Sequence, residues 1–209
     1  MTHSAPLALL FLLRTWWRML LPILLLAGLA LPSVRAEGIV VTSAQLELDS
    51  EADSGWVLAA DFDISLTPRV QEAVSRGVTL YFVIDFELHR ARWYWWDQQT
   101  ARASQTWRLS YHALTRQYRL SQEGLQLRFN TLEEALRSLT RSRNWRVVEK
   151  EKVGLGNQYE AQVRMRLDTT LLAKPLQFNA ITSSDWSLSS NWKRFGFVPQ
   201  LPEKPSEPK

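Results

Sequence analysis

The sequence contains no cysteine, which excludes disulfide bonds, thiolate metal sites and thiol nucleophiles. Histidine is scarce, with only His3, His89 and His112 in the chain. A phosphate-binding P-loop, a Gly-x-Ser-x-Gly elbow and a His-Glu-x-x-His helix are also missing. These absences remove the signatures of common nucleotide-, serine- and zinc-dependent enzymes. We therefore expect a protein that is not an enzyme and has no catalytic residues, metal or cofactor.

A surplus of positive charge is lacking once the first 36 residues are set aside. Those residues contain Arg14, Arg18 and Arg35 and no acidic residue, whereas the remaining 22 basic residues are almost balanced by 21 acidic ones. Nucleic-acid-binding domains retain a basic face or stripe. We therefore expect no nucleic-acid partner.

The first 36 residues resemble a targeting segment. Residues 19–31 (MLLPILLLAGLAL) form an apolar run that is shorter than the roughly 20 residues of a spanning helix, and small residues favour cleavage after Ala36. We expect residues 1–36 to be a signal peptide. The alternative is an uncleaved N-terminal anchor, because residues 7–13 are apolar too. Both interpretations place the rest of the chain in the periplasm, free or anchored to the inner membrane.

Most of the remaining chain alternates between apolar and polar residues, which is typical of half-buried strands. Two short helices interrupt this pattern, one capped by Thr67 and one opened by Asn130, with Glu133 three positions later. Residues 98–104 are polar and predict a loop, and the chain after Thr169 predicts a long ordered extension. We expect a mainly antiparallel β fold, sandwich-like with two short helices, with an α+β arrangement as the alternative.

One domain would span residues 37–198, and the proline-rich residues 199–209 would be a disordered tail. Strands are expected at 39–48, 56–66, 78–88, 106–113, 118–120, 125–129, 145–148 and 159–168.

Residues 78–97 (VTLYFVIDFELHRARWYWWD) are the longest strongly β-type stretch, and they end in four consecutive aromatic residues. Strict alternation would bury Arg90 and Arg92, and unpaired buried guanidinium groups are costly. We therefore expect a bulge or bend between His89 and Trp93. Asp85, Glu87 and His89 share one face of this strand and would bind a metal if His112 joined them. A solvated strand face is the simpler interpretation, and we favour it.

The aromatic run is the strongest candidate for a binding surface. Four successive aromatic residues on a strand can all be buried only if both faces are covered, and a covered core is one interpretation. The other is a patch of exposed rings beside arginine, which suits binding to a sugar, a lipid interface or a protein groove. The candidate binding residues are Arg90, Arg92, Trp93, Tyr94, Trp95 and Trp96.

Residues 86–97, 107–120 and 174–192 resemble an uncharacterised family of exported proteobacterial proteins, catalogued as a domain of unknown function. Some members of that family are named proline-rich signal peptide proteins, and their genes often lie beside that of a membrane sensor histidine kinase. The resemblance implies an envelope-sensing context and no chemistry. We expect a non-enzymatic protein-binding domain whose partner is a membrane protein such as a sensor kinase. The alternative is a module that binds cell-wall glycan or another envelope molecule, and a hydrolase is the remote alternative.

Overall fold

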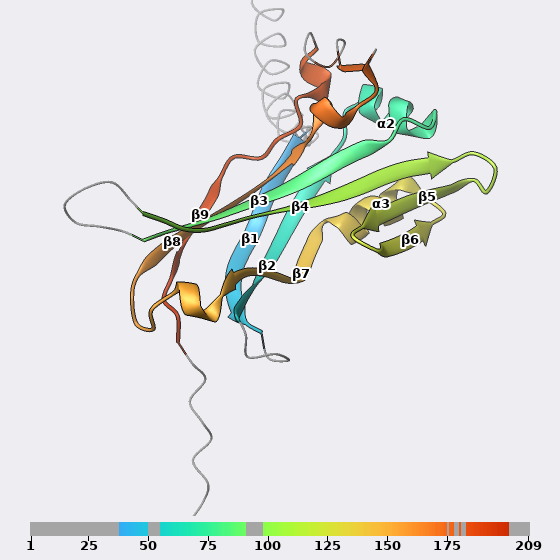
Figure 1. The fold of residues 1–209 in the computed structure, drawn as a ribbon. Helices are drawn as coiled ribbons and strands as arrows, with labels where there is room; N and C mark the ends of the chain where they lie inside the picture. The colour runs from blue at the N-terminus through green and yellow to red at the C-terminus, as the bar shows by residue number, and fades with distance from the viewer. Residues whose placement is uncertain are drawn as a thin grey trace, which may run out of the picture. The chain divides into compact units, whose positions relative to one another are not determined.

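A computed structural model describes residues 38–49, 55–90, 98–174, 176–177, 180 and 183–200. The predicted leader and residues 201–209 lie outside these ranges. The described residues form two antiparallel β-sheets and two α-helices (Figure 1). The predicted fold class, mainly antiparallel β with two short helices, is confirmed.

The two sheets are stacked, and their strands run in different directions. In Figure 1, β3 and β4 of the larger sheet cross in front of β1 and β2 of the smaller one. The smaller sheet has the order β1-β2-β7, with β1 (Gly38–Leu48), β2 (Gly55–Ser65) and β7 (Arg141–Glu149). The larger sheet has the order β6-β5-β4-β3-β8-β9, with β6 (Leu125–Phe129), β5 (Gln117–Gln122), β4 (Gln98–His112), β3 (Leu80–Arg90), β8 (Tyr159–Leu167) and β9 (Lys193–Phe197).

Strand β3 supplies the centre of the hydrophobic core. Its inward-facing side chains alternate along the strand as predicted, and each of them is fully buried: Leu80, Phe82, Ile84, Phe86 and Leu88. The inward row of β8 lies directly beside them and is buried too, because β3 and β8 pair without interruption. Burying one such side chain stabilises the fold by roughly 1.5–3 kcal/mol. This shared apolar row fixes which face of the larger sheet is left for polar side chains.

Helix α2 (Pro68–Ser75) is capped by Thr67, as the sequence predicts. The Thr67 hydroxyl oxygen accepts a hydrogen bond from the Val70 amide at 3.3 Å, and Pro68 occupies the first helical position. The chain leaves the helix through Gly77, whose φ of 92° favours glycine.

Helix α3 (Leu132–Leu139) is capped one residue later than predicted. The cap is Thr131 and not Asn130, because the Thr131 hydroxyl accepts from the Glu134 amide at 3.2 Å. The Glu134 carboxylate in turn accepts from the Asn130 amide at 3.2 Å. Asn130 and Thr131 are both good capping residues, and each is followed three positions later by a glutamate. The sequence therefore allows the helix to begin after either residue. The tertiary fold selects the frame that buries Leu132, Ala135 and Leu139.

The prediction of a loop at residues 98–104 was wrong, because this segment is the first half of β4. Its inward positions are Ala101 and Ala103, which lie opposite Leu88 and Phe86 of β3. Small residues fit there because the residues across from them are large. Alanine gives a weak hydrophobic signal, so the alternation of the strand is hidden in the sequence.

Two further strand boundaries differ from the prediction. Strand β7 begins at Arg141, four residues before the predicted start at Trp145. The segment after Thr169 contains η2 (Thr169–Leu171) and η3 (Ser184–Trp186), but it ends in β9, which was not predicted. Trp186 is buried, so an aromatic residue does hold this extension in place. Pro199, where the predicted tail begins, is buried, and its carbonyl oxygen accepts from the Gly156 amide at 3.0 Å.

Candidate functional site

Among the residues predicted to bind a partner, the structure describes only Arg90. It is the last residue of β3, it is exposed, and it lies between Gln98 of β4 and Tyr159 of β8. The other predicted residues, Arg92, Trp93, Tyr94, Trp95 and Trp96, lie outside the described ranges. Their role in binding therefore stays a prediction.

The described part of the predicted bulge, His89 and Arg90, pairs regularly with β8. An irregularity does occur nearby, but the extra residue lies on β4. Leu88 is opposite Ala101 and His89 is opposite Gln99, so between these two pairs β4 has one residue more than β3. The register shift thus precedes the predicted interval and does not interrupt the pairing of β3 with β8.

The polar side chains of the larger sheet lie on the face opposite the core, which we call the outer face. Residues paired across an antiparallel sheet share a face, and successive residues alternate between faces. The described registers therefore place on the outer face Asp85, Glu87 and His89 of β3, Arg102, Ser104 and Arg108 of β4, Glu160, Gln162, Arg164 and Arg166 of β8, and Arg194 of β9.

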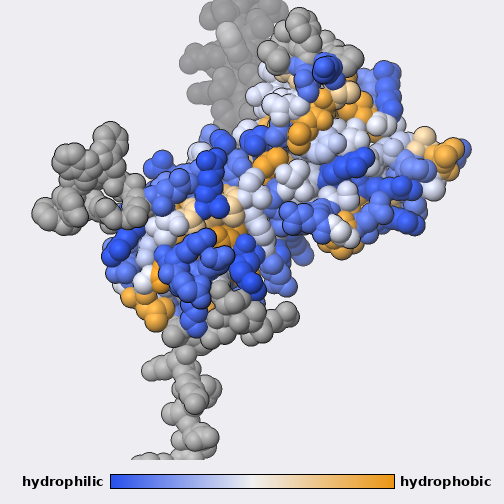
Figure 2. Space-filling view, viewed as in Figure 1, coloured by the Kyte–Doolittle hydropathy of each residue, from blue (hydrophilic) through white to orange (hydrophobic). Residues whose placement is uncertain are grey.

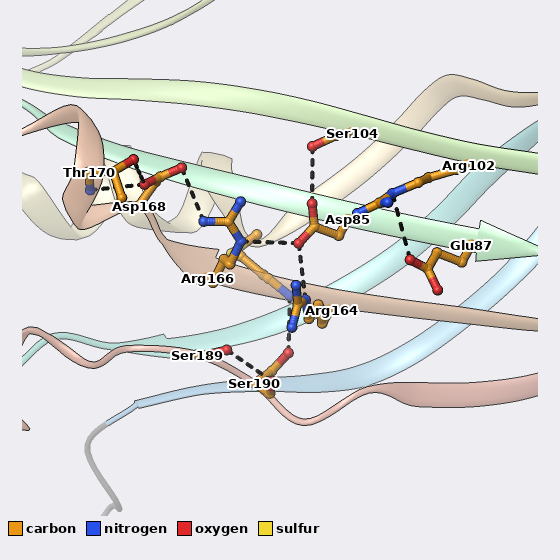
Figure 3. A network of polar contacts seen from close by, with 11 residues as sticks. Asp85, Glu87, Arg102, Ser104, Arg164, Arg166, Asp168, Thr170, Ser189 and Ser190 are labelled. Atoms are coloured by element: carbon orange, nitrogen blue, oxygen red, sulfur yellow. Dashed lines mark hydrogen bonds and ion pairs between the residues drawn. The ribbon is translucent and has the colours of Figure 1, made fainter.

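Asp85 lies at the centre of a network on the outer face (Figure 3). Its Oδ2 accepts from the Nε of Arg164 at 3.0 Å and from the Nε of Arg166 at 3.1 Å. Its Oδ1 accepts from the Ser104 hydroxyl at 3.1 Å. Asp85 is only 6% exposed, so the prediction of a solvated strand face was wrong at this position. A buried carboxylate requires such partners, because an unpaired buried charge is strongly unfavourable.

Arg164 is held on two sides. Its Nε donates to Asp85, and its guanidinium carbon lies 4.4 Å from the centre of the Trp192 ring, in cation–π contact. Within the described residues, the two terminal amino groups of Arg164 make no hydrogen bond. The side chain is 32% exposed. Arg164 therefore presents two oriented N–H donor groups that no described residue of the chain uses.

Arg166 is held more completely than Arg164. Its Nη1 lies 3.1 Å from the Asp168 carboxylate, in addition to the contact of its Nε with Asp85. Burial alone lowers the pKa of Arg166, but the hydrogen bonds to Asp85 and Asp168 outweigh it and raise the pKa above the ordinary arginine value. Burial likewise raises the pKa of Asp168, while hydrogen bonds from Thr170 and Arg166 lower it further, so the net shift is downward. Both groups are therefore charged at neutral pH.

Glu87 forms a second cluster one step along β3. Its carboxylate accepts from Gln162 Nε2 at 2.8 Å and lies 3.3 Å from His89 Nε2 and 3.6 Å from Arg102 Nε. Burial alone raises the pKa of Glu87. The hydrogen bonds from Gln162 and His89 outweigh burial and, together with the charge of Arg102, lower the pKa below its ordinary value. Glu87 is thus an ionised carboxylate occupied by neighbouring side chains.

The metal-site hypothesis required His112 to join Asp85, Glu87 and His89. His112 instead lies near the far end of β4, where it pairs with Gln117 of β5. Within the residues that the structure describes, no three His, Asp or Glu side chains are grouped as metal ligands would be. The structure thus keeps His112 apart from the other three residues.

Comparison with protein families matches a domain of unknown function, DUF4390, whose model covers residues 36–196. The chain belongs to this family. The match includes the strands that build the outer face of this DUF4390 domain, β3, β4 and β8. Comparisons with curated proteins and with solved structures give no significant match. In the described part of the DUF4390 domain, no helix is both long and apolar enough to span a membrane.

The alternation of residues 159–168 predicts one polar face for this strand of the DUF4390 domain, but it does not predict the contacts that this face makes. Arg164 is 79 positions from Asp85 in the sequence, and only the register of β3 against β8 brings them together. Trp192 reaches Arg164 because the chain preceding β9 runs along the same edge of β8 as β9 does, where the Ser190 amide donates to the Met165 carbonyl at 2.9 Å. The sequence signal for these contacts was the presence of Asp85 at a polar position of one alternating strand and of Arg164 and Arg166 at polar positions of another.

Proposed function

We propose that this chain is a non-enzymatic binding domain of the cell envelope, and that Arg164 on the outer face receives an anionic group of its partner. The orientation of this guanidinium group is the observation that supports the proposal. Asp85 and Trp192 fix the side chain, while the terminal N–H groups have no described hydrogen-bond partner. A fixed arginine loses little conformational entropy on binding, and its planar fork matches a carboxylate or phosphate.

A partner protein fits this site better than a glycan does. Arginine lies over one face of the Trp192 ring, so that face is not free to stack on a sugar. We propose a membrane protein, such as the sensory region of a sensor kinase, as the partner. The leader-like first 36 residues support binding in the periplasm, with the domain free or anchored to the inner membrane.

The test is a crosslinking pull-down from cell envelopes with the full chain, comparing the wild type, Arg164→Gln and Arg76→Gln. Arg76 is a matched control because it is an exposed arginine on the C-terminal side of α2, paired with Glu72 at 2.6 Å. We expect the wild type and Arg76→Gln to recover the same membrane protein. Arg164→Gln should bind it about 10- to 100-fold more weakly, because it loses a charge-assisted hydrogen-bonding pair.

The variant Arg164→Lys separates charge from geometry, since lysine keeps the charge but lacks the fork. Circular dichroism of each variant shows whether the fold is retained. Equal recovery by folded Arg164→Gln and by the wild type would contradict the proposal. Tryptophan quenching by cell-wall glycan fragments, lost in Arg164→Gln, would instead favour the glycan alternative.

A further inference from the structure

The turn between β4 and β5 displays a leucine. Leu114 is 92% exposed, more than any other large hydrophobic side chain that the structure describes. The turn around it is ordered: the Thr115 amide donates to His112 Nδ1 at 3.3 Å, and the Thr115 hydroxyl lies 3.1 Å from the same nitrogen. Figure 2 shows a hydrophobic patch at this tip of the molecule, surrounded by hydrophilic surface. An ordered turn thus holds an apolar side chain in solvent.

Arginines belong to this turn and to the two strands that follow it. Arg116 belongs to the turn, with a φ of 51°. Arg119 of β5 lies opposite Arg128 of β6, and its other neighbour is Ser110 of β4. Like charges directly opposite each other destabilise a sheet. The register therefore pairs two arginines on the strands that follow the turn, in addition to Arg116 in the turn itself.

No described acidic residue forms an ion pair with Arg116, Arg119 or Arg128. The Nε of Arg119 is buried and has no hydrogen-bond partner in the described part of the chain. A buried donor without an acceptor costs free energy. An anion that bound here would offset the mutual repulsion of the arginines.

We propose that this tip, consisting of Leu114, Arg116, Arg119 and Arg128, docks on an anionic phospholipid surface. Leucine inserts into the headgroup region, and the guanidinium groups bind lipid phosphates. A convex tip with one protruding leucine suits a fluid lipid interface, which needs no complementary pocket. A protein interface would instead bury a larger patch with aromatic anchors. The tip lies at the opposite end of β4 from Arg102, so the proposal is independent of the Arg164 site.

The absence of native cysteine allows a site-specific test in the full chain. Leu114→Cys carries an environment-sensitive fluorophore at the tip. Leu155→Cys carries the same fluorophore in another turn, at a residue that is also exposed, to 54%. Both proteins are mixed with vesicles of phosphatidylcholine alone, or of phosphatidylcholine containing phosphatidylglycerol. The predicted leader is present in every sample, so its own affinity for lipid cancels in the comparison.

We expect a blue shift at position 114 with phosphatidylglycerol vesicles and none at position 155. The shift should disappear with neutral vesicles and at high salt. Arg119→Gln with Arg128→Gln should weaken this tip response about 30-fold, since each arginine near an anionic surface contributes about a factor of five. Arg69→Gln with Arg76→Gln removes the same charge from α2 and should leave the response unchanged.

Three results would overturn the proposal. The first is an equal response at positions 114 and 155, and the second is a full response after Arg119 and Arg128 are replaced. The third is a response to soluble polyglutamate without any response to vesicles, which would assign the tip to an acidic protein. Loss of partner recovery by Arg164→Gln tests another part of the larger sheet, so the two proposals fail separately.

Discussion

Replacing Asp85 by asparagine removes one negative charge and almost no volume from the centre of the outer face. Both arginines donate to the same oxygen, Oδ2, so the asparagine carbonyl can still accept from Arg164 and Arg166. The Ser104 hydroxyl, which now donates to Oδ1, can rotate to accept from the new amide. The substitution therefore removes the charge and retains the hydrogen-bonding geometry.

The size of the expected destabilisation follows from how deeply Asp85 and its two arginine partners are buried. Removing one member of a buried ion pair typically costs about 3–5 kcal/mol, because the other charge is left uncompensated. Arg164 and Arg166 are each 32% exposed, so water compensates part of that loss. We expect Asp85→Asn to lower the free energy of unfolding by about 2–3 kcal/mol, which lowers Tm by about 4–12 °C in a domain of this size.

The assay is urea unfolding of the full chain, followed by circular dichroism, with Glu160→Gln as the control. Glu160 pairs with Arg194 at 3.8 Å, but the two side chains are 53% and 66% exposed, so its loss should cost at most about 1 kcal/mol. Combining Asp85→Asn with Arg166→Gln should cost less than the sum of the single changes. The reasoning is refuted if Asp85→Asn costs no more than Glu160→Gln.

Two further predictions concern acid stability and helix capping. The pKa of Glu87 is lower in the folded chain than its ordinary value of 4.5. Its contribution to the free energy of unfolding is therefore complete above pH 4.5 and is lost as pH falls through the folded pKa. Unfolding free energy measured from pH 6 to pH 3 should therefore decrease, and Glu87→Gln should flatten that decrease; an unchanged slope would contradict the assignment. Thr131→Ala should lower the free energy of unfolding by about 1 kcal/mol, because it removes the cap of α3, and Asn130→Ala should have a smaller effect. A larger decrease in Tm for Asn130→Ala than for Thr131→Ala would contradict this assignment and identify Asn130 as the cap.

The predictions that succeeded depend on local pattern. The inward row of β3 and that of β8 are read from strict alternation, since burial on one face repeats every second residue. The N-terminus of α2 was predictable from a different local signal, because Thr67 and Pro68 act on adjacent backbone groups. The local signal failed at β4, where inward Ala101 and Ala103 are small because their neighbours across the sheet are large.

The candidate site depended on contacts that no local pattern contains. The sequence alone established that Asp85, Arg164 and Arg166 each occupy a polar face of a strand. Which strands lie side by side, and in what register, was decided by packing the apolar rows of β3 and β8 into one core. That register places one buried carboxylate between two guanidinium groups and leaves one of them oriented by Trp192. The sequence therefore determined the polarity of the outer face, and only the tertiary structure decided which charges meet, because cross-strand pairing joins residues far apart in the chain.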